Sequence, residues 1–251
     1  MKTLLILGSK PEPCLPPADS YDAVACANAS GYSADKYGLP VPVFTAMTAH
    51  LTSGIESGKQ SLQAIRGLHT ETVYLIPRHE KAGKLRKKIQ RLPVAIKTSP
   101  LAFKRGLRRA GFGWDTFASH GLDHYFELIR RLCHDDAELM QLITGKKPST
   151  GLMALVIGMS LGAWQRFILS GFSFELTHAY ADNPEIRERG TVISGHTDTD
   201  LVLLRRLAAV HGNIFTTETT VHEQAGIPLL QAAIEGGPRP DYNSLSNEQL
   251  S

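Results

Sequence analysis

The chain has 251 residues, of which 42% are hydrophobic and 20% are charged. This balance is typical of a globular protein and excludes a disordered or fibrous one. No apolar run approaches the roughly eighteen residues of a membrane-spanning helix, so we expect none. The apolar stretch at the amino end is too short for a signal peptide, and the three cysteines form neither a metal-binding nor a disulfide pattern. We therefore expect a cytoplasmic protein with reduced thiols.

A basic segment between residues 78 and 109 is hidden by the formal net charge of only +3. It holds 12 of the 27 Lys and Arg residues, opposed by a single acidic residue, Glu80. One interpretation is peripheral contact with an acidic polysaccharide or with the anionic inner face of a membrane. A solvated helical face explains the pattern equally well. No nucleic-acid-binding module is recognisable, so we expect no nucleic acid partner.

Short apolar runs alternate with helical patterns along the chain. The runs predict strands at residues 4–7, 23–26, 41–44, 73–76, 94–96, 167–169 and 213–216. The helical patterns lie at residues 46–67, 81–90, 122–132, 135–142, 152–161 and 198–210. This order predicts an α/β fold with a Rossmann-like, mostly parallel sheet flanked by helices, which binds ligands at the carboxyl ends of its strands.

We expect one domain over residues 1–235 and a poorly ordered tail over residues 236–251, which is rich in Gly, Pro and polar residues. The basic insert belongs to a region, about residues 78–125, whose sequence has a weaker strand pattern than the rest of the predicted sheet. Within it, residues 97–125 are predicted to form a small lid or subdomain.

The segment before the predicted helix at residues 152–161 carries a chemical signal. Ser149, Thr150 and Gly151 precede the helix directly, and two hydroxyls with a glycine at this place are typical of a helix cap. Free N–H groups and the positive end of the helix dipole bind anions there. Many helices are capped in this way without a ligand, so a purely structural role remains the commoner explanation.

A second signal follows the predicted strand around residues 167–169. The strand ends in Ser-Gly, and a glycine at this end lets a ligand approach the backbone closely. Further on, His196 precedes the predicted helix at residues 198–210, and an imidazole suits a general base at neutral pH. Asp198 or Asp200 could orient its ring or cap the helix. Any one of ten histidines is most often a surface or packing residue, and this alternative stays open.

Taken together, these blocks resemble the sialyltransferases. Lys147 to Gly151 (Lys-Pro-Ser-Thr-Gly) is similar to the small sialylmotif of the animal-type family. Ser170 to Phe174 and Gly195 to Asp200 resemble the bacterial Campylobacter-type family. At the amino end, Leu5 to Ser9 and Asp22 to Asn28 resemble the first nucleotide-binding strand and the large motif. The similarity covers residues 2–44 and 146–218, whereas most of residues 45–145 cannot be aligned.

The resemblance implies an inverting, metal-independent glycosyltransferase that needs no cofactor. Such an enzyme moves a 2-keto sugar acid from a donor activated by cytidine monophosphate (CMP) to a glycan or lipid-linked acceptor. The residues that would contact the cytidine are Gly8, Ser9, Asn28, Gly171, Phe172 and Ser173. Those that would contact the donor's carboxylate and phosphate are Ser149, Thr150 and Gly151. Tyr180 and His178 would stabilise the departing phosphate, and His196 would be the general base.

Three departures from the family pattern leave the donor sugar open. Ser9 stands where an asparagine is usual, Thr45-Ala46 replace a second asparagine, and Glu175 stands near the place of a phosphate-binding tyrosine. Either sialic acid or Kdo, another 2-keto sugar acid carried by CMP, fits these residues.

Three alternatives remain. Asp198-Thr199-Asp200 is formally the Asp-x-Asp motif of metal-dependent nucleotide-sugar transferases. The Gly195–Thr199 block also resembles the zinc-ligand strand of aminoacylase-type hydrolases, with His211, Glu218, His222 and Glu223 as the remaining candidate ligands. The third alternative is a non-catalytic nucleotide-binding module on the same fold.

Overall fold

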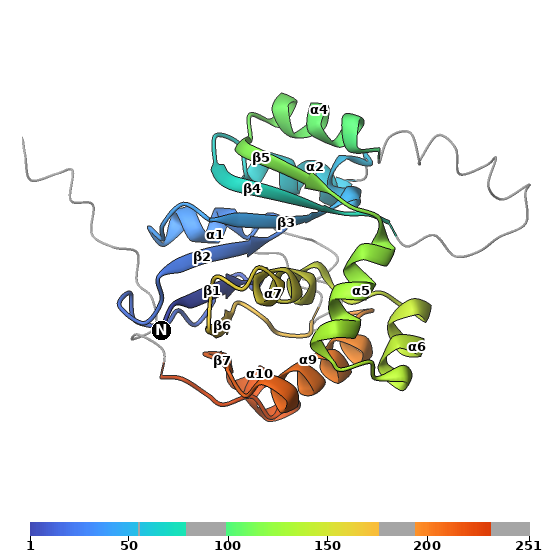
Figure 1. Cartoon of the computed structure of the whole chain (residues 1–251). Coiled ribbons are helices and arrows are strands. Elements are labelled where there is room, and N and C mark those ends of the chain that lie inside the picture. Colours follow the sequence, from blue (N-terminus) through green and yellow to red (C-terminus); the bar gives the residue numbers. More distant parts are fainter. Residues whose placement is uncertain (55, 79–98, 176–193, 232–251) are drawn as a thin grey trace, which may run out of the picture.

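A computed structural model describes residues 1–54, 56–78, 99–175 and 194–231, and within them seven parallel strands form one sheet (Figure 1). The strand order is β5-β4-β3-β2-β1-β6-β7. The strands are β1 (Thr3–Leu7), β2 (Ala23–Ala27), β3 (Phe44–Thr48), β4 (His69–Ile76), β5 (Gly113–Ser119), β6 (Arg166–Ser170) and β7 (Ile214–Thr216). The predicted α/β class and parallel sheet are confirmed.

Helices cover both faces of the sheet, which explains why the central strands are buried along almost their whole length. One face packs against α5 (Leu122–Leu132), α6 (Ala137–Gly145), α7 (Thr150–Ser160), α9 (Thr197–His211) and α10 (Thr219–Ala225). The other packs against α1 (Gly31–Lys36), α2 (Glu56–Ala64) and α4 (Pro100–Ala110), and a short 3-10 helix, η1 (Ala49–Thr52), follows β3. The helix α7 is buried on nearly all sides because it lies between the sheet and α5 and α9.

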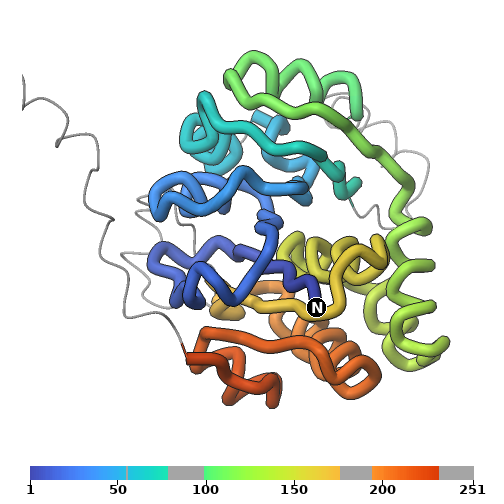
Figure 2. The backbone as a smooth tube through the Cα atoms, turned by 60° about the vertical axis from the view of Figure 1, so that its left-hand side comes forward, coloured from blue at the N-terminus to red at the C-terminus, as the bar shows by residue number. Residues whose placement is uncertain are grey.

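The sheet is doubly wound. From β1 the chain proceeds through β2, β3, β4 and β5 toward one edge, whereas β6 and β7 extend the sheet on the other side of β1. The strands β1 and β6 therefore lie side by side although they are far apart in the sequence (Figure 2). At such a reversal the two following loops diverge and leave a crevice at the carboxyl ends of the strands, where ligands bind.

Several predicted boundaries were wrong. The third strand begins at Phe44 rather than ending there, so the helix predicted at residues 46–67 is in fact the end of β3, then η1, then α2. Residues 97–125 were expected to form a lid or subdomain, but residues 100–119 form α4 and β5, and β5 pairs with β4 along the edge of the sheet. Edge strands are half-exposed, and the mixed sequence of β5 therefore lacks a strong strand pattern.

The predicted helix at residues 81–90, the predicted strand at 94–96 and the tail at 236–251 lie outside the described residues. The described end of the basic segment lies on α4. There Lys104 lies over the Phe117 ring, 4.5 Å from its centroid, and Arg108 lies over Trp114 at 5.7 Å, so two of its charges help to pack α4 on β5. No helix among the described residues is long and apolar enough to cross a membrane.

Candidate active site

A cleft of about 730 Å³ opens at the reversal between β1 and β6. Ten residues singled out in the sequence line it together: Gly8, Ser9, Asn28, Ser149, Thr150, Gly151, Gly171, Phe172, Ser173 and His196. They come from the ends of β1, β2 and β6 and from the starts of α7 and α9. Tyr180 and His178 lie outside the described residues. The cleft therefore brings together sequence motifs that lie as far apart in the chain as Gly8 and His196.

Two backbone turns in direct contact form the floor of the cleft, one at Gly8 after β1 and one at Gly171 after β6. Gly8 donates its N–H to the Ser170 carbonyl oxygen (2.8 Å), and a Cβ on Gly8 would stand 2.3 Å from the Gly171 oxygen. Gly171 itself has φ +74°, a conformation that side chains rarely adopt. Both positions thus require glycine, which leaves the strand ends open to a ligand.

Asn28 joins the ends of β2 and β3. Its Oδ1 accepts the Thr48 N–H (2.9 Å), and its own N–H bonds to Ala46 O (2.7 Å). The residue has φ +54°, which asparagine tolerates better than most side chains. Because Oδ1 already accepts the Thr48 N–H, the Nδ2 group of the amide is the part with its donors left to offer, and such donors suit carbonyl, ribose or phosphate oxygens.

The start of α7 has a serine cap and N–H groups without partners inside the helix, a combination that binds anions in many proteins. Ser149 is its N-cap, and the Ser149 Oγ accepts the Leu152 N–H (3.4 Å). Thr150 and Gly151 form the first turn, where N–H groups point out of the helix. A Cβ on Gly151 would come within 2.7 Å of the Phe172 ring, so glycine allows that ring to pack beside the helix end. No residue of the first turn of α7 is acidic, but the Asp200 carboxylate from α9 accepts the N–H of the N-cap residue, Ser149.

His196, the N-cap of α9, and Asp200, one turn further along, hold the segment that leads into α7. The His196 Nδ1 lies 2.9 Å from the Lys147 carbonyl oxygen, and the Asp200 Oδ1 accepts the Ser149 N–H at 2.7 Å. Neither Asp198 nor Asp200 orients the His196 ring, because a backbone carbonyl does so. These bonds fix the imidazole relative to the helix end across the cleft.

The contact with Lys147 determines the tautomer of His196. A carbonyl oxygen only accepts hydrogen bonds, so Nδ1 carries the proton and Nε2 of the neutral ring keeps a lone pair. Burial lowers the pKa of His196, and the positive charges of Lys147 and Lys146 lower it further, against the raising effect of the Lys147 carbonyl. The ring is therefore neutral, and basic at Nε2, at physiological pH.

Basic side chains on the cleft wall were not singled out in the sequence as ligand contacts. His50, Arg78, Lys146 and Lys147 line the cleft beside the start of α7. Burial lowers the pKa of Lys147 to about 8, and its Nζ donates to the Pro77 oxygen (3.0 Å). Burial and the charges of Arg78 and Lys147 lower the pKa of His50. The positive charges of Arg78, Lys146 and Lys147 favour a ligand with more than one negative group, whereas His50 is neutral at physiological pH.

His50 corrects one detail of the sequence comparison. Because β3 extends to Thr48, Thr45 and Ala46 lie within the strand and are buried. The polar side chains that line the cleft here are Thr48, the last residue of β3, and His50, which follows the strand. The sequence comparison matched the family's second asparagine to Thr45-Ala46, and this match was wrong because the predicted end of the third strand was wrong.

The candidate ligands of the two metal-based alternatives do not converge in the part of the chain that the structure describes. Asp198 is exposed, whereas Asp200 is 4% exposed and bonds to Ser149, because residues two apart on a helix point in different directions. His211 and His222 bond to the carbonyl oxygens of Leu132 and Ile227. Within the four described ranges, no group of three or more His, Cys, Asp or Glu side chains could hold a metal ion.

A doubly wound parallel sheet with a crevice and a helix N-terminus at its reversal is an architecture on which nucleotide-binding proteins are built. The chain matches no protein-family model and no curated protein sequence. It does resemble solved structures. The sialyltransferase CstII from Campylobacter jejuni, in complex with the substrate analogue CMP-3FNeuAc, is 15% identical with a TM-score of 0.54, over 96% of this chain and 93% of that one.

Two further structures agree. CST-II in complex with a trisaccharide acceptor and CMP is 12% identical, with a TM-score of 0.51 over 94% of this chain and 88% of that one. The monofunctional alpha-2,3-sialyltransferase Cst-I from Campylobacter jejuni is 14% identical, with a TM-score of 0.50 over 100% and 89%. The resemblance inferred from the sequence is confirmed in the fold. At this low identity the activity has to be argued from the cleft.

Proposed function

We propose that the protein is an inverting, metal-independent glycosyltransferase that moves a 2-keto sugar acid from its CMP-linked donor to a glycan or lipid-linked acceptor. The observation that carries the proposal is the position of a neutral imidazole, His196, and the start of α7 in one cleft at the sheet reversal. A general base and an anion-binding helix end are the two parts that such a transfer needs.

The chemistry follows from these parts. As CMP leaves, its phosphate gains negative charge and the anomeric carbon becomes cationic. The N–H groups of Thr150 and Gly151, with Lys146 and Lys147 nearby, stabilise the leaving phosphate, and a preorganised donor of this kind is typically worth about 10²–10³ in rate. Tyr180 and His178 are proposed to contribute further donors. The Nε2 of His196 takes the proton from the acceptor hydroxyl, so that the hydroxyl oxygen attacks the face opposite the departing phosphate.

The nucleotide side of the cleft is assigned to the floor between β1 and β6. Gly8, Ser9 and Asn28 on one side, and Gly171 to Ser173 on the other, offer backbone groups, an amide and the Phe172 ring to the cytidine. The solved CstII complexes with CMP and with CMP-3FNeuAc support a CMP-linked donor. Sialic acid and Kdo share a carboxylate, which the basic side chains of Arg78, Lys146 and Lys147 would attract. Both sugars are therefore candidate donors.

The acceptor is assigned to a glycan, since the CST-II structure with a trisaccharide acceptor has the same fold. An anionic or lipid-linked acceptor would be attracted to the basic segment at residues 78–109 and would bring the protein to a membrane face. Charge reversal at Lys87 and Lys88 tests this, with transfer to an anionic and to a neutral acceptor as the readout. A selective loss on the anionic acceptor is expected, and equal rates on both would remove the segment from the proposal.

A thermal-shift screen tests the nucleotide class without a known acceptor, because a ligand that binds the native state raises its melting temperature. We expect stabilisation by CMP, CMP-sialic acid or CMP-Kdo, and less by uridine or guanosine diphosphates. His196→Ala then tests the base. The variant should turn over at least about a hundredfold more slowly with nearly unchanged donor affinity.

His211→Ala is the matched control, because His211 lies on the same helix and also contacts a backbone carbonyl, that of Leu132. It should keep wild-type turnover. A protein that binds no cytidine nucleotide would contradict the proposal as a whole. Full activity in His196→Ala would contradict the assignment of the base.

A further inference from the structure

Glu218 is a buried carboxylate that the proposed chemistry does not use. It lies between β7 and α10, is 2% exposed, and does not line the cleft. A carboxylate removed from water destabilises a protein unless hydrogen bonds and an opposite charge compensate it. The contacts of Glu218 therefore show which groups compensate its buried charge.

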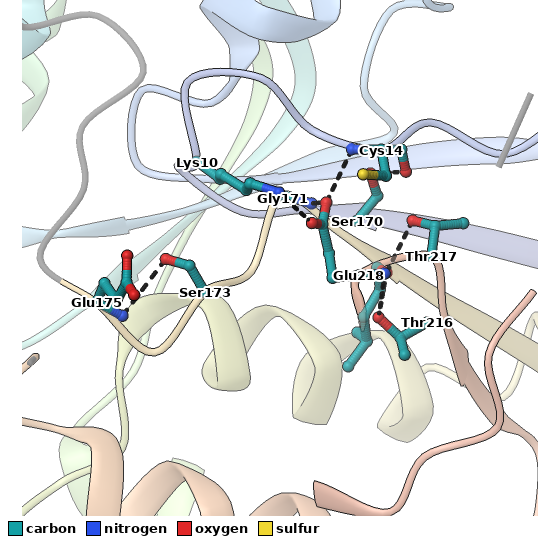
Figure 3. Close-up of polar contacts among 10 residues, drawn as sticks. Lys10, Cys14, Ser170, Gly171, Ser173, Glu175, Thr216, Thr217 and Glu218 are labelled. Carbon is teal, nitrogen blue, oxygen red and sulfur yellow. Dashed lines mark hydrogen bonds and ion pairs between the residues drawn. The ribbon is translucent and has the colours of Figure 1, made fainter. Parts of the chain in front are cut away.

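Among the described residues, the contacts of its carboxylate lead to the two segments that form the floor of the cleft (Figure 3). The Oε1 atom accepts the N–H of Cys14 and the N–H of Gly171, each at 2.8 Å. The Oε2 atom pairs with the Lys10 ammonium at 2.5 Å. The Lys10 backbone N–H in turn donates to the Gly171 oxygen (2.9 Å), and the Ser170 hydroxyl donates to the Cys14 oxygen (2.8 Å).

One side chain thus ties together two segments that the sequence separates widely. The loop at residues 8–14 follows β1, the turn at Gly171 follows β6, and both contribute residues to the cleft. Burial alone would lower the pKa of Lys10, but the hydrogen bond and charge of Glu218 raise it, so the ammonium stays charged. Charge-assisted bonds of this kind are stronger and more directional than neutral ones.

We propose that Glu218 is a positioning residue that sets the distance between the loop at residues 8–14 and the Gly171 turn, and so shapes the nucleotide side of the cleft. The proposal rests on the proposed function in one respect, which is that the ligand is a CMP-linked sugar acid. Glu218 acts through Gly171 and through the loop that holds Gly8 and Ser9, without touching the ligand itself.

Glu218→Gln is the direct test, because glutamine keeps an oxygen for the two N–H groups but turns an amide NH₂ toward the Lys10 ammonium. We expect the CMP dissociation constant, measured by calorimetry, to rise at least about tenfold, since hydrogen bonds to charged groups are the stronger ones. The donor KM should rise with kcat nearly unchanged. Amide hydrogen exchange at Cys14 and Gly171 should accelerate in the absence of any nucleotide.

Asp136→Asn is the matched control. Asp136 likewise accepts a backbone N–H, that of Leu139 (3.0 Å), and pairs with a cation, Arg206 (3.0 Å), but it caps α6 away from the cleft floor. It should lower the melting temperature without weakening CMP binding. If Glu218→Gln does not fold, Lys10→Met and Lys10→Arg replace it, and only the arginine variant should retain wild-type affinity.

The outcomes separate this proposal from the proposed function. Unchanged exchange at Cys14 and Gly171 in Glu218→Gln would overturn the positioning role, and so would CMP affinity equal to that of the wild type. Wild-type protein that fails to bind CMP would overturn the proposed function instead. In that case the exchange measurement alone still decides whether Glu218 fixes the two segments.

Discussion

Replacing Asp200 by asparagine should make the protein more stable at neutral pH and alter how its stability depends on pH. Asp200 is 4% exposed, and its Oδ1 accepts the Ser149 N–H. Burial raises the pKa of this carboxyl from 3.8 to about 6, although the hydrogen bonds from Ser149 and the charge of Lys146 oppose the increase. Asparagine keeps the accepting oxygen and removes the buried charge.

The size of the effect follows from the difference between the folded and unfolded pKa values. A raised pKa means that the folded state binds the proton more tightly, so stability falls as pH rises from about 4 through about 6. A shift of about 2 units at about 1.36 kcal/mol per unit corresponds to about 3 kcal/mol. Above pH 6 the whole penalty is present, so Asp200→Asn gains at most about 3 kcal/mol at pH 7.5. The burial of its amide NH₂ subtracts from this gain.

Urea unfolding at pH 4.5 and at pH 7.5, for the wild type and the variant, measures the effect. The difference in unfolding free energy between the two proteins should be greater at pH 7.5, because most of the wild-type penalty has disappeared at pH 4.5. Asp198→Asn, at an exposed carboxylate on the same turn of α9, controls for a general loss of negative charge. Parallel pH dependences in the wild type and in Asp200→Asn would refute the reasoning.

Three further predictions concern the cleft. Since burial and the neighbouring lysines lower the pKa of His196 in the free protein, the acidic limb of the pH–kcat/KM profile should fall below pH 6.5, and a limb above that value would argue against this base. Gly151→Ala would bring a Cβ within 2.7 Å of the Phe172 ring, so we expect a loss of about 1–3 kcal/mol in unfolding free energy and weaker CMP binding. Gly121→Ala, where a Cβ meets nothing within 4 Å, should leave CMP binding unchanged and affect stability only through its place as the N-cap of α5. Turnover should also be unaffected by a chelator, and strict dependence on Mn²⁺ or Mg²⁺ would instead favour the metal-dependent alternative.

The elements that the sequence predicted well are those with a strong local pattern. The helix predicted at residues 122–132 has those same bounds in α5, and β1 and β6 differ from the prediction by one residue at each end or less. The edge strand β5 and the short helix α1 were missed. Their side chains are mixed because tertiary neighbours cover only part of them.

The candidate site was predictable to the extent that its residues stand next to the ends of predicted strands and helices. The parallel order of the strands brings such ends to one edge of the sheet, so Gly8, Ser149, Gly171 and His196 could be grouped before any coordinates were known. His50 was missed because a wrong boundary for β3 left it inside a predicted helix.

The sequence by itself determined the α/β class, the glycine turns, the helix cap and the histidine, since each of these depends on residues close together in the chain. Only the tertiary structure decided which groups hold these parts in place. The carbonyl of Lys147 orients His196 from 49 residues away, and Glu218 bonds to Cys14 across 204 residues. No local pattern records such a contact, because the hydrogen-bonding groups of a side chain meet a partner only after the strands between them have paired and brought both ends to the same edge of the sheet.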